Sequence, residues 1–136
     1  MDIEATENAI VERLKEQMPE LEVKPFPDDP ANYQLIHPLG ALLVRFLGES
    51  LTEPRASGTI SQTEKMEFET VVVSRNLRTH QGVYAYIGQV KAALTGKFDL
   101  SLPRAYLVGV RFLSVSNGVW QYSVICAFNS IHEEEE

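Results

Sequence analysis

The strongest constraint on the fold of this chain is a long β-hairpin near its C-terminal end. Residues 104–129 form two apolar-rich arms joined by Asn117-Gly118. A type I′ turn needs positive φ at both central residues, and Asn-Gly tolerates this best. About a fifth of the chain therefore lies in one ladder with no reactive group at its turn. One alternating set of side chains comprises Tyr106, Val108, Val110, Phe112, Trp120, Tyr122, Val124, Cys126 and Phe128.

The other alternating set along this hairpin is too apolar for a face that is open to water. A solvated face of an antiparallel sheet would carry more charged side chains and fewer aliphatic ones. We expect this face to be partly buried, either under a loop or against another copy of the chain. The set comprises Leu107, Gly109, Arg111, Leu113, Val115, Val119, Gln121, Ser123, Ile125 and Ala127.

Hydrophobic periodicity in the rest of the chain predicts two helices and three strands. Helical spacing predicts helices over 3–18 and 79–95. Apolar runs predict strands over 21–26, 40–48 and 65–77, and the segment 49–62 is read as a long polar loop. The order is α-β-β-β-α-β-β. It predicts an α+β fold with a largely antiparallel five-stranded sheet and two helices packed on one face.

Length and charge limit the organisation and the class of protein. We expect 136 residues to form one domain over 1–130, followed by a disordered acidic tail over 131–136. The net charge of −7 argues against gripping nucleic acid by its phosphates, which requires a basic face. No apolar run approaches the roughly 20 residues that cross a bilayer. We therefore expect no membrane partner.

The residues that could carry chemistry are few and scattered. His37, His80 and His132 have no metal-ligand spacing, and Cys126 is the one cysteine, so we expect neither a metal nor another cofactor. Phosphate-binding glycine motifs are absent. The adjacent acids Asp28 and Asp29 are typical of a turn. These features predict a protein without enzymatic activity.

Four charged side chains in strands need further comment. Glu67 and Glu69 share what we expect to be the solvent face of a strand, without a partner for acid–base chemistry. Arg45 and Arg111 interrupt apolar runs, and a buried arginine must be paired. Their partners are acids either in the same chain or across a subunit contact.

Five segments in order resemble the Mu-like bacteriophage tail terminator family. The similarity extends over residues 3–129 and depends on the order and spacing of these segments. They are L-x-V-K-P-F-P at 21–27, L-L-V-R-F at 42–46, V-V-V-S-R-N-L at 71–77, G-x-Y-x-x-I-x-x-V-K-A-A-L-T-G at 82–96 and R-F-L-S-V-S-N-G-V-W-Q-Y at 111–122.

This resemblance implies a structural virion protein that forms a ring, a hexamer, on the head-proximal end of the tail tube. Such a ring stops tail polymerisation and presents a surface for head–tail joining. Its implied partners are further copies of the chain, the tail tube protein, a head-completion or neck protein and, in a contractile tail, the sheath protein. DNA only passes through the channel. The implied location is the tail or neck of the virion, assembled in the cytoplasm of the host bacterium.

Candidate contact residues follow from position in the chain. We expect contacts to the tube or the ring lumen from the predicted polar loop and the hairpin turn, at Glu49, Glu53, Arg55, Ser57, Thr59, Gln62, Asn117 and Gly118. We expect subunit or neck contacts between the two prolines Pro27 and Pro38, at Asp28, Asp29, Tyr33 and His37.

Two other classes of protein remain as alternatives. The chain could be a small ligand-binding or regulatory α+β domain whose sheet face holds a metabolite. It could also be an enzyme that uses carboxylates at Asp28, Asp29, Glu67 or Glu69.

Overall fold

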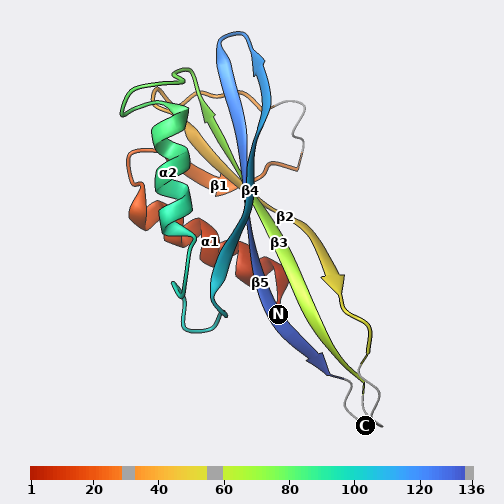
Figure 1. Cartoon of the computed structure of the whole chain (residues 1–136). Helices are drawn as coiled ribbons and strands as arrows, with labels where there is room; N and C mark the ends of the chain where they lie inside the picture. The colour runs from red at the N-terminus through yellow and green to blue at the C-terminus, as the bar shows by residue number, and fades with distance from the viewer. Residues whose placement is uncertain (29–32, 55–59, 134–136) are drawn as a thin grey trace.

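The computed structural model describes residues 1–28, 33–54 and 60–133, which form one mixed sheet with two helices on one face (Figure 1). The strands lie in the order β1-β2-β3-β5-β4, and every neighbouring pair is antiparallel except β1 and β2. This arrangement confirms the predicted α+β fold and its element order. The elements are α1 (Ile3–Gln17), β1 (Glu22–Pro25), β2 (Ala41–Leu51), β3 (Ser61–Ser74), α2 (Val83–Ala93), β4 (Ala105–Ser116) and β5 (Val119–Glu133).

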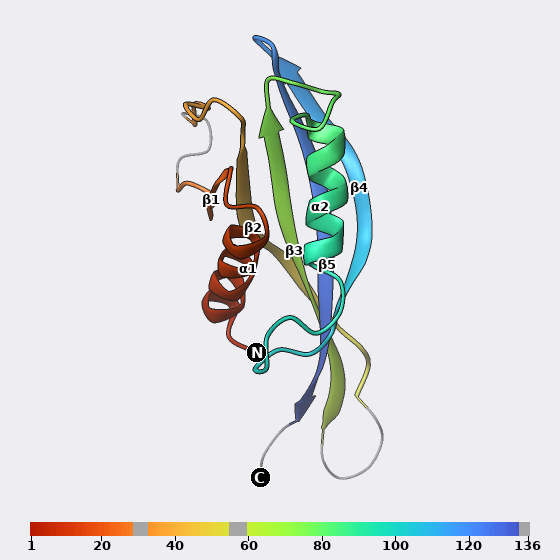
Figure 2. The same cartoon turned by 90° about the vertical axis from the view of Figure 1, so that its left-hand side faces the viewer.

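The two helices cover four of the five strands. α1 packs against β1 and β2, whereas α2 packs against β3 and β5, and the helices also touch each other (Figure 2). The core between helices and sheet includes Ile10 and Leu14 of α1 and Tyr86 and Val90 of α2, all 1% exposed or less. The apolar sides of the two helices pack on β1, β2, β3 and β5. β4 therefore lies at the sheet edge without a helix over it.

The turn of the long hairpin has the predicted conformation, but one of its strands departs from simple alternation. Asn117 and Gly118 have φ values of 51° and 75°, as a type I′ turn requires. The pairing of β4 with β5 shifts register between Leu107 and Gly109 and again between Phe112 and Ser114. These β-bulges reverse the side on which β4 side chains project. The predicted alternation is therefore wrong for Tyr106. We expected Tyr106 and Val110 on one face of the sheet, but Tyr106 pairs with Ala127 and Val110 pairs with Val124, which lie on opposite faces.

Both ends of the predicted loop 49–62 are strand, so its predicted bounds were wrong. β2 continues to Leu51 and β3 begins at Ser61, and the described residues between them are 52–54 and 60. Both faces of the sheet are open to water here, so polar side chains suit either face and no alternation marks the strands. Just beyond Leu51 the N–H of Thr52 donates to the carbonyl of Thr63 at 3.0 Å, and the N–H of Thr63 donates to the Thr52 hydroxyl at 2.8 Å.

Three other boundaries differ from the predicted ones. β3 ends at Ser74, three residues before the predicted end, and α2 begins at Val83 rather than 79. Thr79 has a φ of 78°, which no helix admits, and carbonyls of Asn76 and Leu77 accept the first helical N–H groups. β5 continues to Glu133, past the expected boundary at residue 130.

Two glycines provide a matched test of how backbone geometry supports this sheet. A Cβ at Gly40, where φ is +152°, would lie 2.6 Å from the carbonyl oxygen of Val73, while a Cβ at Gly88 in α2 would meet nothing within 4 Å. We expect Gly40→Ala to lower the free energy of unfolding by about 2 kcal/mol. Gly88→Ala should raise it by about 0.5–1 kcal/mol, because alanine favours the helix. Urea denaturation measures both, and equal effects at the two positions would contradict the account.

Candidate functional site

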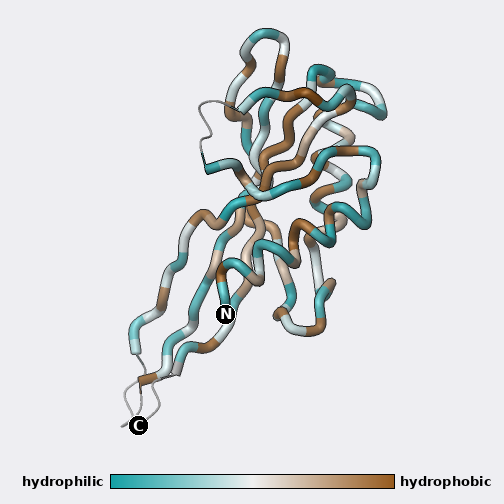
Figure 3. Tube along the Cα trace, turned by 180° about the vertical axis from the view of Figure 1, so that it is seen from behind, coloured by the Kyte–Doolittle hydropathy of each residue, from teal (hydrophilic) through white to brown (hydrophobic). Residues whose placement is uncertain are grey.

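The face of the sheet opposite the helices is buried at one end by a segment of the chain itself. Residues 33–37 and Phe26 lie over the start of β2 and the end of β3, where Leu35 packs on Val71 and Val73. Figure 3 shows the molecule from behind, with hydrophobic residues (brown) gathered in the strands at this end. Arg75 fixes this segment by donating to the carbonyl oxygens of Leu35 at 2.6 Å and His37 at 3.3 Å. The expected partial burial of this face is therefore confirmed at that end, and a loop provides the cover.

A buried carboxylate lies farther along the same face. Glu69 is 1% exposed, although we expected it on a solvent face, so that expectation was wrong. One oxygen accepts from Arg45 Nε at 2.7 Å, and the other accepts from Ser123 Oγ at 2.7 Å. The Arg45 guanidinium also lies 5.0 Å from the centre of the Phe26 ring. Arg45 thus pairs with an acid of the same chain, which decides between the two alternatives for this residue.

A cavity of about 550 Å³ lies where the 33–35 segment meets the hairpin turn. Its lining is mainly polar, and its one charged lining group is Arg75, whose donors are already bound to two carbonyl oxygens. Burial raises the pKa of the Tyr33 phenol to about 12, so this hydroxyl is neutral at physiological pH. The cavity thus offers hydrogen-bonding groups and one guanidinium, two of whose N–H groups are bound to carbonyl oxygens of the chain. It is lined by Tyr33, Gln34, Leu35, Val73, Arg75, Ser116, Asn117, Val119 and Gln121.

The edge strand β4 exposes a row of large apolar side chains, which we call the β4 patch. Its outer edge has no strand partner among the described residues. Some of these side chains pack partly against β5, as Phe112 does edge-on against Tyr122 at 5.4 Å between ring centres. The patch comprises Tyr106, Val108, Val110, Phe112, Leu113 and Val115, which are 37–50% exposed.

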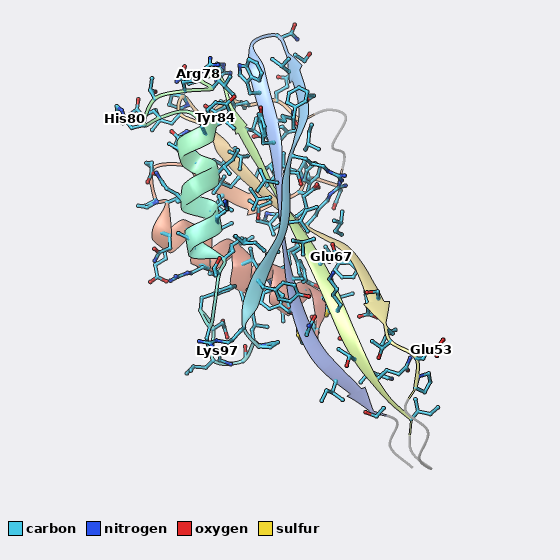
Figure 4. The ribbon with its side chains drawn as sticks, viewed as in Figure 1. Glu53, Glu67, Arg78, His80, Tyr84 and Lys97 are labelled. Atoms are coloured by element: carbon cyan, nitrogen blue, oxygen red, sulfur yellow. The ribbon has the colours of Figure 1, made fainter. Side chains whose placement is uncertain are left out.

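The opposite end of the sheet projects beyond both helices and forms what we call the arm (Figure 1). It consists of residues 46–54, 60–67 and 129–133 of the three central strands β2, β3 and β5 and the ends of the connection between β2 and β3. Three aliphatic side chains of the arm, Leu51, Ile60 and Ile131, are 41–70% exposed. Figure 4 shows Glu53 at its far end, with Glu67 nearer the centre of the sheet.

The predicted contact residues fall at two ends of the molecule rather than on one surface. Glu49, Glu53 and Gln62 belong to the arm, and the Gln62 side chain donates to the carbonyl of Thr52 at 2.8 Å. Asn117 and Gly118 lie at the far end of the hairpin (Figure 1). The register of β3 with β5 explains this separation. Ser61, where β3 begins, is opposite Glu133, whereas Ser74, where β3 ends, is opposite Trp120 beside the hairpin turn.

The second predicted group shares the end of the hairpin turn. Asp28 is exposed, and Tyr33 lines the cavity together with Asn117. His37 has a structural part, because its Nδ1 accepts from the backbone N–H of Leu39 at 3.1 Å. Four of the predicted residues lie outside the described residues, namely Asp29, Arg55, Ser57 and Thr59.

The sequence analysis missed the β4 patch, because a strand's position at a sheet edge is not encoded in its own alternation. It identified the same residues as part of a hairpin. The useful signal was quantitative: two short helices cannot cover five strands, so one strand must remain uncovered.

Titratable groups do not converge at any of these surfaces. Over residues 1–28, 33–54 and 60–133, no three His, Cys, Asp or Glu side chains are placed to hold a metal ion. Cys126 is 1% exposed, and burial raises the pKa of its thiol to about 12, which leaves it protonated and unreactive. Among the described helices, none is both long and apolar enough to span a membrane.

Comparison with known proteins gives solved structures with a similar fold and one family. A chain in the solved structure titled "Virion of native gene transfer agent (GTA) particle" matches with a TM-score of 0.50 and 18% identity, over 90% of this chain and 92% of that chain. At this identity the match shows a shared fold. Comparison with curated protein sequences gives no significant match. The model of the family described as Gp37 protein matches residues 10–136, and the chain therefore belongs to this family of phage proteins.

Proposed function

We propose that this protein is a structural component of the phage virion and acts as its tail terminator. In this role copies of the chain form a ring on the head-proximal end of the tail tube, stop tail polymerisation and present a surface for head–tail joining. Membership of a phage protein family and a fold shared with a chain of a gene transfer agent virion support a virion protein. The terminator role extends this support through the resemblance of the five sequence segments.

The observation that carries the proposal is the β4 patch. Its six exposed apolar side chains project from both faces of one edge strand, and a concentration of exposed apolar side chains marks contacts with other proteins. An edge strand also has unpaired backbone groups that native proteins usually cover or protect. A chain with this edge and with no convergent chemistry among its described residues is suited to assembly rather than to catalysis.

The two opposite ends of the sheet suit a protein placed between two partners. We assign the arm, with Glu49, Glu53 and Gln62, to contacts with the tail tube. We assign the hairpin end, with Asp28, Tyr33 and Asn117, to the neck or head-completion protein. A sheath protein is a further partner if the tail is contractile. The net charge of −7 suits a ring through which DNA passes without adhering.

The proposed ring is a hexamer that belongs to the tail or neck of the particle and is assembled in the host cytoplasm. Deleting the gene from its phage tests this. We expect headless tails of uncontrolled, greater length in electron micrographs, and a normal length distribution when the wild-type chain is supplied from a plasmid. Tails of normal length in the deletion would refute the terminator role.

A ligand-binding or regulatory domain is the second candidate, and the cavity beside the hairpin turn favours it. The cavity of about 550 Å³ is within the size range of small-molecule sites. Such sites are mostly apolar with a few convergent polar groups, whereas this lining is mainly polar and its guanidinium is occupied. The deletion experiment separates the two, because a regulatory domain would leave tail length unchanged.

A further inference from the structure

The β4 patch is shaped for packing through side chains rather than for addition of another strand. β-Bulges twist an edge strand and interrupt its row of backbone donors and acceptors. β4 has two of them, and the bulged residues Val108 and Leu113 are 44% and 39% exposed. A partner surface must therefore offer apolar side chains of its own.

The arm offers such side chains at the other end of the molecule. Leu51, Ile60 and Ile131 are 47%, 41% and 70% exposed, although their described neighbours in the chain are polar. The far part of the arm, where these side chains lie, projects beyond the helices, so another molecule can reach it (Figure 1).

The two surfaces carry opposite charges. The described arm residues contain two exposed glutamates, Glu49 and Glu53. Glu64 is buried beside the N-terminal amine, and Glu67 is paired with Lys65, so these two acids are already neutralised within the chain. Residues 104–128, which include β4 and most of β5, contain Arg104 and Arg111 and no acidic residue. Both of these arginines are exposed.

We propose that the arm of one copy packs on the β4 patch of a neighbouring copy, with the exposed Glu49 and Glu53 of the arm facing Arg104 and Arg111. This inference depends on the proposed function, because it identifies the contact that closes the ring. The two surfaces are different parts of the chain, so the contact is heterologous, and heterologous contacts that close produce rings. A patch-to-patch dimer would bring arginines together, and an arm-to-arm dimer would bring glutamates together, so like charges oppose both.

Site-directed crosslinking in assembled particles tests the contact. The deletion phage is supplied with the full chain carrying Leu113→Cys and Ile131→Cys, and its particles are treated with a short bifunctional maleimide. The native Cys126 is buried and protonated, so it does not compete. We expect a ladder of covalent oligomers that ends at the ring. The matched control pairs Ile131→Cys with Ile36→Cys, which is 85% exposed but lies in the segment that covers β2 and β3 rather than in β4, and should give monomers.

A charge exchange provides the second measurement. We expect Arg111→Glu to reduce the crosslinked fraction about tenfold and to produce tails longer than normal. Adding Glu49→Arg to the same chain should restore the crosslinked fraction and the normal tail length. Circular dichroism checks that the variants fold. Both positions are exposed, so folding should be retained.

The outcomes separate this inference from the proposed function. Crosslinks from Leu113→Cys alone to another Leu113→Cys, or only to the tube protein, would overturn the arm-to-patch contact while the terminator role stands. The arm-to-patch contact would also be overturned, and the terminator role would stand, if the Arg111→Glu variant terminates tails normally and the chain with Leu113→Cys and Ile131→Cys stays monomeric. If deletion of the gene leaves tail length unchanged, the proposed function itself fails.

Discussion

Phe68→Ala should lower the free energy of unfolding by about 3–5 kcal/mol, the largest effect that we expect from a single substitution. Phe68 is fully buried in β3, the central strand of the sheet. Its ring packs edge-on against Phe46 of β2 at 5.5 Å and against Phe128 of β5 at 6.0 Å between ring centres. Phe128 in turn meets Phe98, which follows α2. Truncation at Phe68 would therefore leave a cavity in the middle of an aromatic row that joins three strands.

Phe112→Ala is the matched control for this prediction. Phe112 is 50% exposed at the sheet edge, so its truncation removes less buried surface and leaves no closed cavity. We expect a loss of about 1 kcal/mol. Urea denaturation followed by circular dichroism gives both values. If Phe112→Ala costs as much as Phe68→Ala, then the core does not lie between the helices and the sheet as described.

Arg45→Met should lower the free energy of unfolding by about 2–3 kcal/mol, because it leaves the carboxylate of Glu69 without its cation. The Glu69 side chain is 2% exposed, so water cannot replace the lost donor fully. The Arg45 side chain is 48% exposed, and this partial access to solvent keeps the expected loss below that of a fully buried pair. Ser123 would still donate to the second oxygen of Glu69.

Two further variants give this prediction its controls. Lys15→Met breaks an exposed ion pair with Glu12, where the side chains are 53% and 73% exposed, and should change stability by less than about 0.5 kcal/mol. Arg45→Met combined with Glu69→Leu removes both charges and should recover most of the loss. A double variant as unstable as Arg45→Met alone would show that the loss comes from the contact of the Arg45 guanidinium with the Phe26 ring instead.

Local sequence signals predicted those parts of the fold that depend on one face being buried. Helical spacing at Ile10 and Leu14 identified α1 because only one side of that helix meets the core. Asn117-Gly118 identified the hairpin turn because few other dipeptides accept positive φ at both positions. The class of the fold and the order of its elements followed from these signals.

The arm and the edge strand could not be predicted in this way. In the arm both faces of the sheet meet water, so Glu49 to Leu51 and Ser61 to Thr63 show no alternation and look like a loop. The bulges of β4 depend on the pairing with β5 and leave no local signal in the sequence. The burial of Glu69 results from a long-range pair with Arg45 on the neighbouring strand, 24 residues away in the chain.

The candidate contacts were predicted residue by residue but not as surfaces. Tyr33 and Asn117 were placed in different groups, yet they line one cavity. Glu53 and Asn117 were placed in one group, yet they lie at opposite ends of the sheet. Only the register of β3 with β5 determines which loops meet, and that register spans the whole length of the sheet.

The central claim is that this chain assembles on copies of itself at the end of a tail tube. Quantitative mass spectrometry of purified particles, scaled to the known copy number of a capsid protein, measures this most directly. The account predicts that each particle contains the protein in the number of copies that makes a single ring. Absence of the protein from particles, or an abundance comparable to that of the tube protein, would contradict it.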